Sequence, residues 1–146
     1  MKLYNLTENK VVVENLKIAE KYSEKMKGLL GRNEIAADEG LLIKNCNWVH
    51  TFFMKFPIDI VFLKAQITSI LRLPRRPAED GQIKSTDYAG KGIYKVIKIL
   101  YNKNPWQIGS PVWEADSVLE LKAGTSSPQA KNLISIGDEL EIVKDL

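Results

Sequence analysis

Residues 48–63, WVHTFFMKFPIDIVFL, form the longest mostly apolar segment of the chain and constrain its fold more than any other stretch. Successive side chains of a strand point to opposite faces, and in 48–56 apolar residues fall on both. A strand that is apolar on both faces needs cover on both, which predicts a central strand of a sheet. Pro57 has no N–H to donate to a strand ladder, so we predict that pairing breaks or bends there before Ile58.

Short strand-like runs dominate the rest of the chain. Turn signals separate further predicted strands at 3–6, 10–13, 16–19, 40–44, 94–100, 117–122 and 139–143. Residues 23–30, SEKMKGLL, predict a short helix that Ser23 caps and Gly31 ends. The fold class predicted is mainly β, a small single-domain β barrel or jelly-roll-like sandwich with one short N-terminal helix. A chain of 146 residues suits one domain over residues 1–146.

The composition excludes several classes of protein. Cys46 is the only cysteine, so no intramolecular disulfide can form. Zinc sites need three or four protein ligands, and besides Cys46 the chain has one histidine, His50, so we expect no metal and no cofactor. The first ten residues show no signal-peptide pattern, and Lys55 and Asp59 interrupt the longest apolar run. We therefore expect a cytoplasmic protein that does not enter a membrane.

The net charge of +3 is confined to one segment of the chain. Residues 64–86 hold five basic and two acidic residues, and the remaining 16 basic and 16 acidic residues cancel. Nucleic-acid binding is therefore not expected, since a neutral body provides no electrostatic footprint. The basic cluster within this segment is the only hint of it, and its arginines are Arg72, Arg75 and Arg76.

Several uncommon sequence words occur in a fixed order along the chain. They are KMKGLLGR (25–32), EGLLI (39–43), CNWVHTFFMKFPIDIVFL (46–63), PW (105–106), ADSVLELKAGT (115–125) and IGDELEI (136–142). In these words the chain resembles the bacterial and archaeal family known as domain of unknown function 192. The resemblance implies a compact, mainly β fold of barrel or jelly-roll type, and it implies no activity.

The same resemblance places a strand soon after Leu63, following an aspartate and a glycine turn. Here that pattern comes only at 87–100, DYAGKGIYKVIKIL. We therefore predict an inserted loop at about 64–86, because the entropy of closing a loop grows slowly with its length. The alternative is that 67–73, ITSILRL, is a genuine strand of the sheet.

His50 and Asp59 are the candidate catalytic residues. His50 changes charge near neutral pH, so it could act as a general base or contact a ligand; it could equally be a buried, hydrogen-bonded core imidazole. Asp59 could pair with His50, accept a hydrogen bond from a ligand hydroxyl, or cap backbone N–H groups after Pro57. Glu120, in VLEL, is more typical of cross-strand pairing than of catalysis.

Ligand binding is predicted for His50 and Asp59 together with Lys55, Trp48 and Trp106. Lys55, with Arg32, could bind an anion, although such side chains commonly extend to solvent. Trp48, Trp106 and Trp113 could form a stacking surface, although tryptophans of small β folds commonly pack in the core or at its rim.

Three functions remain open from these residues. We favour a binding or accessory module, expected to be a monomer, for an unknown small polar molecule or a short peptide segment. The first alternative is a hydrolase or lyase with His50 and Asp59 as an acid–base pair. The second is a structural or interaction protein without an active site, which would use the basic segment as its contact surface. A pocket where His50 and Asp59 converge would favour the first two.

Overall fold

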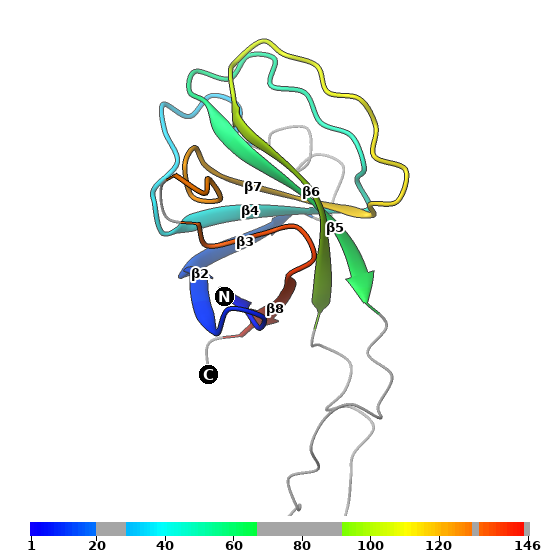
Figure 1. The fold of residues 1–146 in the computed structure, drawn as a ribbon. Coiled ribbons are helices and arrows are strands. Elements are labelled where there is room, and N and C mark those ends of the chain that lie inside the picture. The colour runs from blue at the N-terminus through cyan, green and yellow to red at the C-terminus, as the bar shows by residue number, and fades with distance from the viewer. Residues whose placement is uncertain (20–28, 67–91, 130–131, 145–146) are drawn as a thin grey trace, which may run out of the picture.

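The computed structural model describes residues 1–19, 29–66, 92–129 and 132–144, which form one eight-stranded sheet (Figure 1). The strands are β1 (Lys2–Asn5), β2 (Lys10–Val13), β3 (Asn15–Ala19), β4 (Glu39–Lys44), β5 (Ile58–Gln66), β6 (Ile93–Lys103), β7 (Ser117–Lys122) and β8 (Glu139–Val143). Their order is β2-β1-β8-β6-β5-β7-β4-β3, with β3 and β4 parallel and all other neighbours antiparallel. The predicted mainly β class is confirmed, and the ranges of β2, β7 and β8 agree with the prediction.

Each face of the sheet carries its own hydrophobic core. Because side chains alternate along a strand, β5 and β7 supply both cores: Val61 and Leu119 belong to the first, Ile60 and Val118 to the second. The first core is completed by β1, β2 and β8. The second is covered by loops, since it includes Ile35 and residues of the 45–57 and 104–116 segments. Those two loops cross the upper end of the sheet in Figure 1.

The prediction of a barrel or sandwich was wrong in its detail. There is one sheet, and its outer strands β2 and β3 do not pair with each other. Glu14 alone separates them in sequence, and the N–H groups of Glu14 and Asn15 both donate to Asp38 O, which directs β3 toward β4. Leu16 N, on β3, donates to Met1 O, which directly precedes β1, at 2.7 Å. The sheet therefore curls until its edges approach, without closing.

Two further predicted elements are absent or lie elsewhere. Residues 48–56 form a loop, in which His50 makes one isolated bridge to Ile108, because the chain turns at 51–53. No helix is found in the described residues; most of the predicted 23–30 helix lies outside them, and its last residues form a turn. No helix of the described part is long and apolar enough to cross a membrane.

The predicted insertion is described only at its start. Residues 64–66 extend β5 and pair with β6, as far as Gln66 opposite Ile93. The remaining residues of the segment, 67–86, lie outside the described residues, so the insertion stays a prediction. β6 (Ile93–Lys103) is the strand that the family resemblance places after Leu63, and it pairs with β5.

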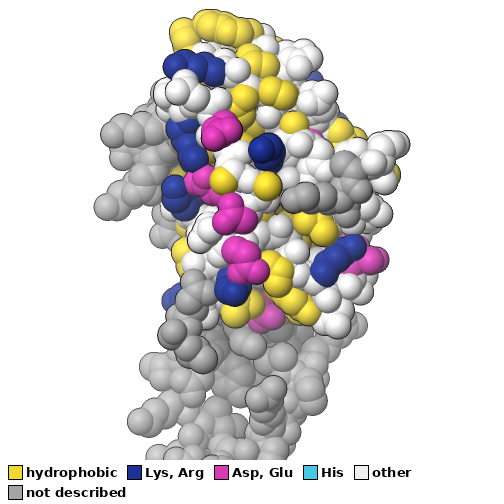
Figure 2. Space-filling view, turned by 90° about the vertical axis from the view of Figure 1, so that its left-hand side faces the viewer, with side chains coloured by type: hydrophobic (Ala, Val, Ile, Leu, Met, Phe, Trp, Pro, Cys, Tyr) yellow, Lys and Arg dark blue, Asp and Glu magenta, His cyan; other side chains and the backbone are white. Residues whose placement is uncertain are grey.

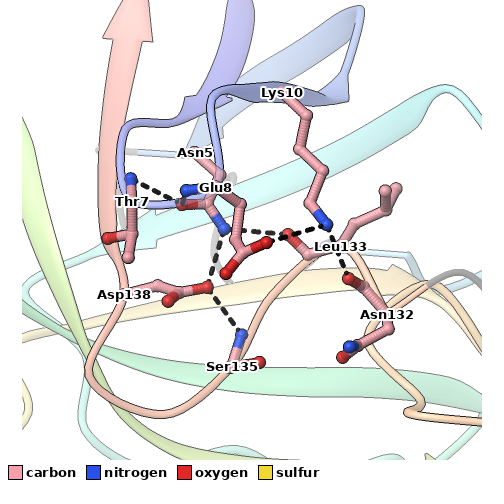
Figure 3. Close-up of polar contacts among 8 residues, drawn as sticks. All are labelled: Asn5, Thr7, Glu8, Lys10, Asn132, Leu133, Ser135 and Asp138. Carbon is pink, nitrogen blue, oxygen red and sulfur yellow. Dashed lines mark hydrogen bonds and ion pairs between the residues drawn. The ribbon is translucent and has the colours of Figure 1, made fainter.

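A buried polar network ties the β1–β2 turn to the approach of β8 (Figure 3). The Asn5 side chain is fully buried and donates to Leu133 O and to Asp138 Oδ2, at 2.9 and 2.7 Å. Its Oδ1 accepts the N–H groups of Thr7 and Glu8. All its donors and acceptors are thus used, which fixes two turns that are remote in sequence.

We expect Asn5→Ala to lower the free energy of unfolding by about 2–3 kcal/mol, because it leaves several buried groups without partners. Asn15→Ala is the matched control, since Asn15 is exposed and its amide makes one bond, to Asp38. That variant should lose less than about 0.5 kcal/mol. Urea unfolding of both variants measures the difference, and equal losses would contradict the structural role assigned to Asn5.

Candidate functional site

Two loops, 45–57 and 104–116, are joined side by side at one end of the sheet. Thr51 is buried at their junction: its N–H donates to Gln107 O at 2.8 Å, and its Oγ1 accepts the N–H of Gln107 at 2.9 Å. The N–H of Trp106 in turn donates to Thr51 O at 2.8 Å. Further bonds link Gly109 to Val49, Val112 to Asn47 and Thr51 Oγ1 to Asn104 O. The loops therefore present their side chains from a fixed frame.

A continuous row of rings lies on this frame. His50 contacts Trp48 edge-on at 5.7 Å between ring centroids and stacks on Phe52 at 5.2 Å. Trp106 then contacts Phe52 at 6.4 Å and Phe53 at 4.9 Å. We call these residues, Trp48, His50, Phe52, Phe53 and Trp106, the aromatic platform. Figure 2 shows hydrophobic side chains exposed at the upper end of the molecule, where Figure 1 places the two loops.

Phe53 and Trp106 of the aromatic platform are each unfavourable for folding in two ways, by their exposure and by their backbone conformation. Phe53 and Trp106 are 65% and 61% exposed, and both have left-handed backbones, with φ of 62° and 64°. For bulky residues this conformation costs about 1–2 kcal/mol, and glycine is the residue that adopts it freely. Strained backbone of this kind clusters at binding sites. Folding alone does not account for two exposed aromatic rings at these positions.

The structure brings three of the predicted ligand-binding residues together and places Lys55 apart from them. The His50 ring is half-buried, and its Nδ1 has no hydrogen-bond partner among the described residues. Trp48 is held by a bond from its Nε1 to Gly109 O at 2.6 Å. Lys55 is exposed and donates to Asn33 Oδ1 at 3.0 Å. Trp48, His50 and Trp106 are therefore brought together, and Lys55 makes its contact outside the row of rings.

Asp59 serves as an anchor for backbone. Its buried carboxylate accepts the N–H groups of Asn102 at 2.9 Å, Gly124 at 3.1 Å and Ser126 at 2.8 Å. These donors come from the end of β6 and from the turn after β7. Within the described residues, no hydrogen bond joins Asp59 to His50. Asp59 therefore caps backbone N–H groups, as one of the three alternatives proposed. The two candidate catalytic residues, His50 and Asp59, are not paired in the described structure.

Arg32 has its own partner. Its guanidinium forms two bonds to Glu39, at 2.7 and 2.6 Å, and Lys17 adds an ion pair at 2.8 Å. The Arg32 bonds, with the Lys17 bond and both positive charges, lower the pKa of Glu39 to about 2 against the opposing effect of burial. The bond to Glu39 also raises the pKa of Arg32. Arg32 is therefore already paired with the carboxylate of Glu39, which takes the place of the anion that it was predicted to bind.

The sequence did not single out Thr51 or Phe53, because the strand predicted over 48–56 would place neither residue at a turn. The run HTFF gave no local signal of the turn, because it contains none of the residues that commonly form turns, Gly, Pro, Asn, Asp or Ser. No group of three or more His, Cys, Asp or Glu residues in the described part of the chain could hold a metal ion.

Comparisons with known proteins give a family and a fold. The family model of uncharacterized ACR proteins, DUF192, matches residues 4–142. A solved protein of unknown function from Novosphingobium aromaticivorans DSM 12444 has a TM-score of 0.59 at 19% identity, over 97% of this chain and 82% of that one. A solved protein from Sinorhizobium meliloti 1021, described as a putative transcription regulator, has a TM-score of 0.58 at 23% identity, over 95% and 88%. No curated protein matches the chain.

Proposed function

The chain belongs to the uncharacterized family DUF192, and on this premise we propose that it is a binding module whose ligand, a short peptide segment or a small polar molecule, contacts the aromatic platform. The observation that carries the proposal is the pair Phe53 and Trp106, two exposed aromatic rings in contact on left-handed backbone. Such positions cost folding free energy, and residues kept at that cost are typical of binding sites.

The exposed rings of the aromatic platform suit ligands with planar or cyclic groups. Exposed aromatic faces stack on planar groups and pack against proline rings, and few side-chain torsions need to be ordered when they bind. The loop frame around Thr51 is already hydrogen-bonded, so binding would cost little additional ordering. The acid–base alternative has less support, because both oxygens of Asp59 already accept backbone N–H groups.

Two-dimensional NMR of the labelled protein tests the proposal. The probes are short acetylated peptides rich in proline, arginine or tryptophan, and nucleosides as small planar polar molecules. We expect at least one probe to shift the indole signal of Trp106 and the amide signal of Phe53. Probes that perturb only signals remote from both loops, or none at all, would contradict the proposal.

Removal of a platform ring should weaken probe binding without unfolding the protein. For Phe53→Gly and Trp106→Gly we expect a Kd about tenfold higher, because one stacking contact contributes on the order of 1 kcal/mol. The free energy of unfolding should change by less than about 1 kcal/mol, since relief of the left-handed strain offsets the lost ring contact. Trp113→Gly is the matched control: Trp113 is 83% exposed and lies outside the row of rings. Equal loss of binding in all three variants would contradict the assignment.

A further inference from the structure

Glu120 is a buried carboxyl in the middle of the sheet. It lies on β7, opposite Ile60 of β5 and Leu41 of β4, and only 6% of its surface is exposed. Both opposing residues belong to the second hydrophobic core, as does Val118 on the same face of β7. The position is therefore one that packing would fill with an aliphatic side chain.

Glu120 differs from the other buried acidic residues that the structure describes. Asp59 accepts three backbone N–H groups, Asp138 accepts Asn5 and Ser135, and Glu39 binds Arg32 and Lys17. Glu120 has no hydrogen bond and no ion pair within the described part of the chain. A carboxyl that is mostly buried and has no protein partner is uncommon in native proteins, and a missing ligand is one explanation for it.

We propose that Glu120 is the anionic group of a second binding site, which takes an alkylguanidinium or alkylammonium group. The ionised carboxyl lacks a positive partner, which such a group provides through directed N–H donors. The aliphatic surroundings, Leu41 and Ile60, suit the methylene stem of that ligand. A metal ion fits less well, because the described residues include no group of three or more His, Cys, Asp or Glu side chains that could hold one.

Other charged residues lie on the strands and loops that form or cover this face of the sheet. Burial raises the pKa of Glu120 to about 7, so near neutral pH the site changes from neutral to negative. No described charged residue on the elements packed against this face makes an ion pair with Glu120. They are Lys64 on β5, Lys98 and Lys103 on β6, Lys122 on β7, Glu39 on β4, Lys17 on β3, Arg32 and Glu34 in the 29–35 loop, His50 and Lys55 in the 45–57 loop, and Glu114 and Asp116 in the 104–116 loop.

The titration of Glu120, followed by its 13Cδ NMR shift from pH 5 to 9, tests the proposal on the wild-type chain. The probes are butylguanidinium and its neutral isostere N-butylurea. If the cation binds the ionised carboxyl, saturating butylguanidinium lowers the apparent pKa of Glu120 by about one unit, a tenfold preference for the ionised form. N-butylurea leaves it unchanged. An apparent pKa that does not move with butylguanidinium, or that moves equally with both probes, overturns the proposal.

A variant and a second pair of probes complete the test. At pH 8.5 we expect Glu120→Gln to weaken butylguanidinium binding about tenfold, whereas Glu39→Gln, which removes another carboxylate of the same face, leaves it within about twofold. Equal effects of the two variants overturn the assignment to Glu120. A short acetylated arginine peptide, compared with its citrulline counterpart, shows whether the cation can be a side chain or must be a free small molecule. Phe53→Gly should not alter this binding, so this proposal and the proposed function can fail independently.

Discussion

Replacement of Asp59 by alanine is expected to lower the free energy of unfolding by about 4 kcal/mol. The variant leaves three N–H groups without their acceptor: that of Ser126, which is buried, and those of Asn102 and Gly124, which are partly buried. Each buried group that loses its partner costs about 1–3 kcal/mol, and the three costs are not fully additive. The C-terminal end of β6 and the turn after β7 would lose the carboxylate that holds them together.

Asp116→Ala is the matched control for this prediction. Asp116 also accepts a backbone N–H, that of Ala65, and its side chain is 33% exposed, so water can replace it. We expect that variant to lose about 1 kcal/mol or less. Urea unfolding at neutral pH measures both. If Asp59→Ala is no worse than Asp116→Ala, the carboxylate is not an anchor, and a functional role for Asp59 becomes the better interpretation.

Glu120→Gln is expected to stabilise the protein, by about 3 kcal/mol at pH 8 and by little at pH 4.5. Burial raises the pKa of Glu120 from 4.5 to about 7, so the folded state holds a proton that the unfolded chain releases. Each pKa unit is worth about 1.4 kcal/mol, and wild-type stability therefore falls as pH rises from about 4.5 to 7. Glutamine keeps the shape of the neutral carboxyl and does not ionise.

Glu39 provides a control with the opposite sign. Its pKa is lowered to about 2, so its ionised form stabilises the folded state at pH values above 4.5, and this contribution is lost as pH falls toward 2. Glu39→Gln should therefore destabilise the protein at pH 7 and have little effect near pH 2. Urea unfolding of Glu120→Gln at pH 4.5, 6 and 8, and of Glu39→Gln at pH 2, 4.5 and 7, tests the pair. A stability difference between Glu120→Gln and wild type that does not grow with pH would contradict the buried, unpaired state of Glu120.

Much of the fold could be predicted because the strands obey local rules. Alternating apolar residues and turn signals located β2, β7 and β8 at their observed bounds. The 48–56 segment failed for a physical reason: it is apolar on both sides because Val49 and Met54 enter the second core, whereas Phe53 faces solvent. That the sheet stays open could not be predicted either, since this depends on the bend of the chain between β2 and β3.

For the candidate site, the sequence indicated several of the residues that lie together but not the contacts that they make. Trp48, His50 and Trp106 do lie in one row of rings. The pairing of His50 with Asp59 depends on distances that strand periodicity does not contain, and backbone N–H groups occupy Asp59 instead. The isolation of Glu120 could not be foreseen, because a sequence shows a charge and not the partners it lacks.

The position of β8 has a consequence for biosynthesis. β8 lies between β1 and β6, so in the sheet of the described residues it is the strand that pairs with both the β1–β2 hairpin and the remaining strands. Its residues Leu140 and Ile142 also complete the first hydrophobic core. During synthesis the β1–β2 hairpin therefore has no partner strand in this sheet until β8 has emerged from the ribosome. Until then the edge of β1, and that of β6 once it is made, stay unpaired and can pair with other chains.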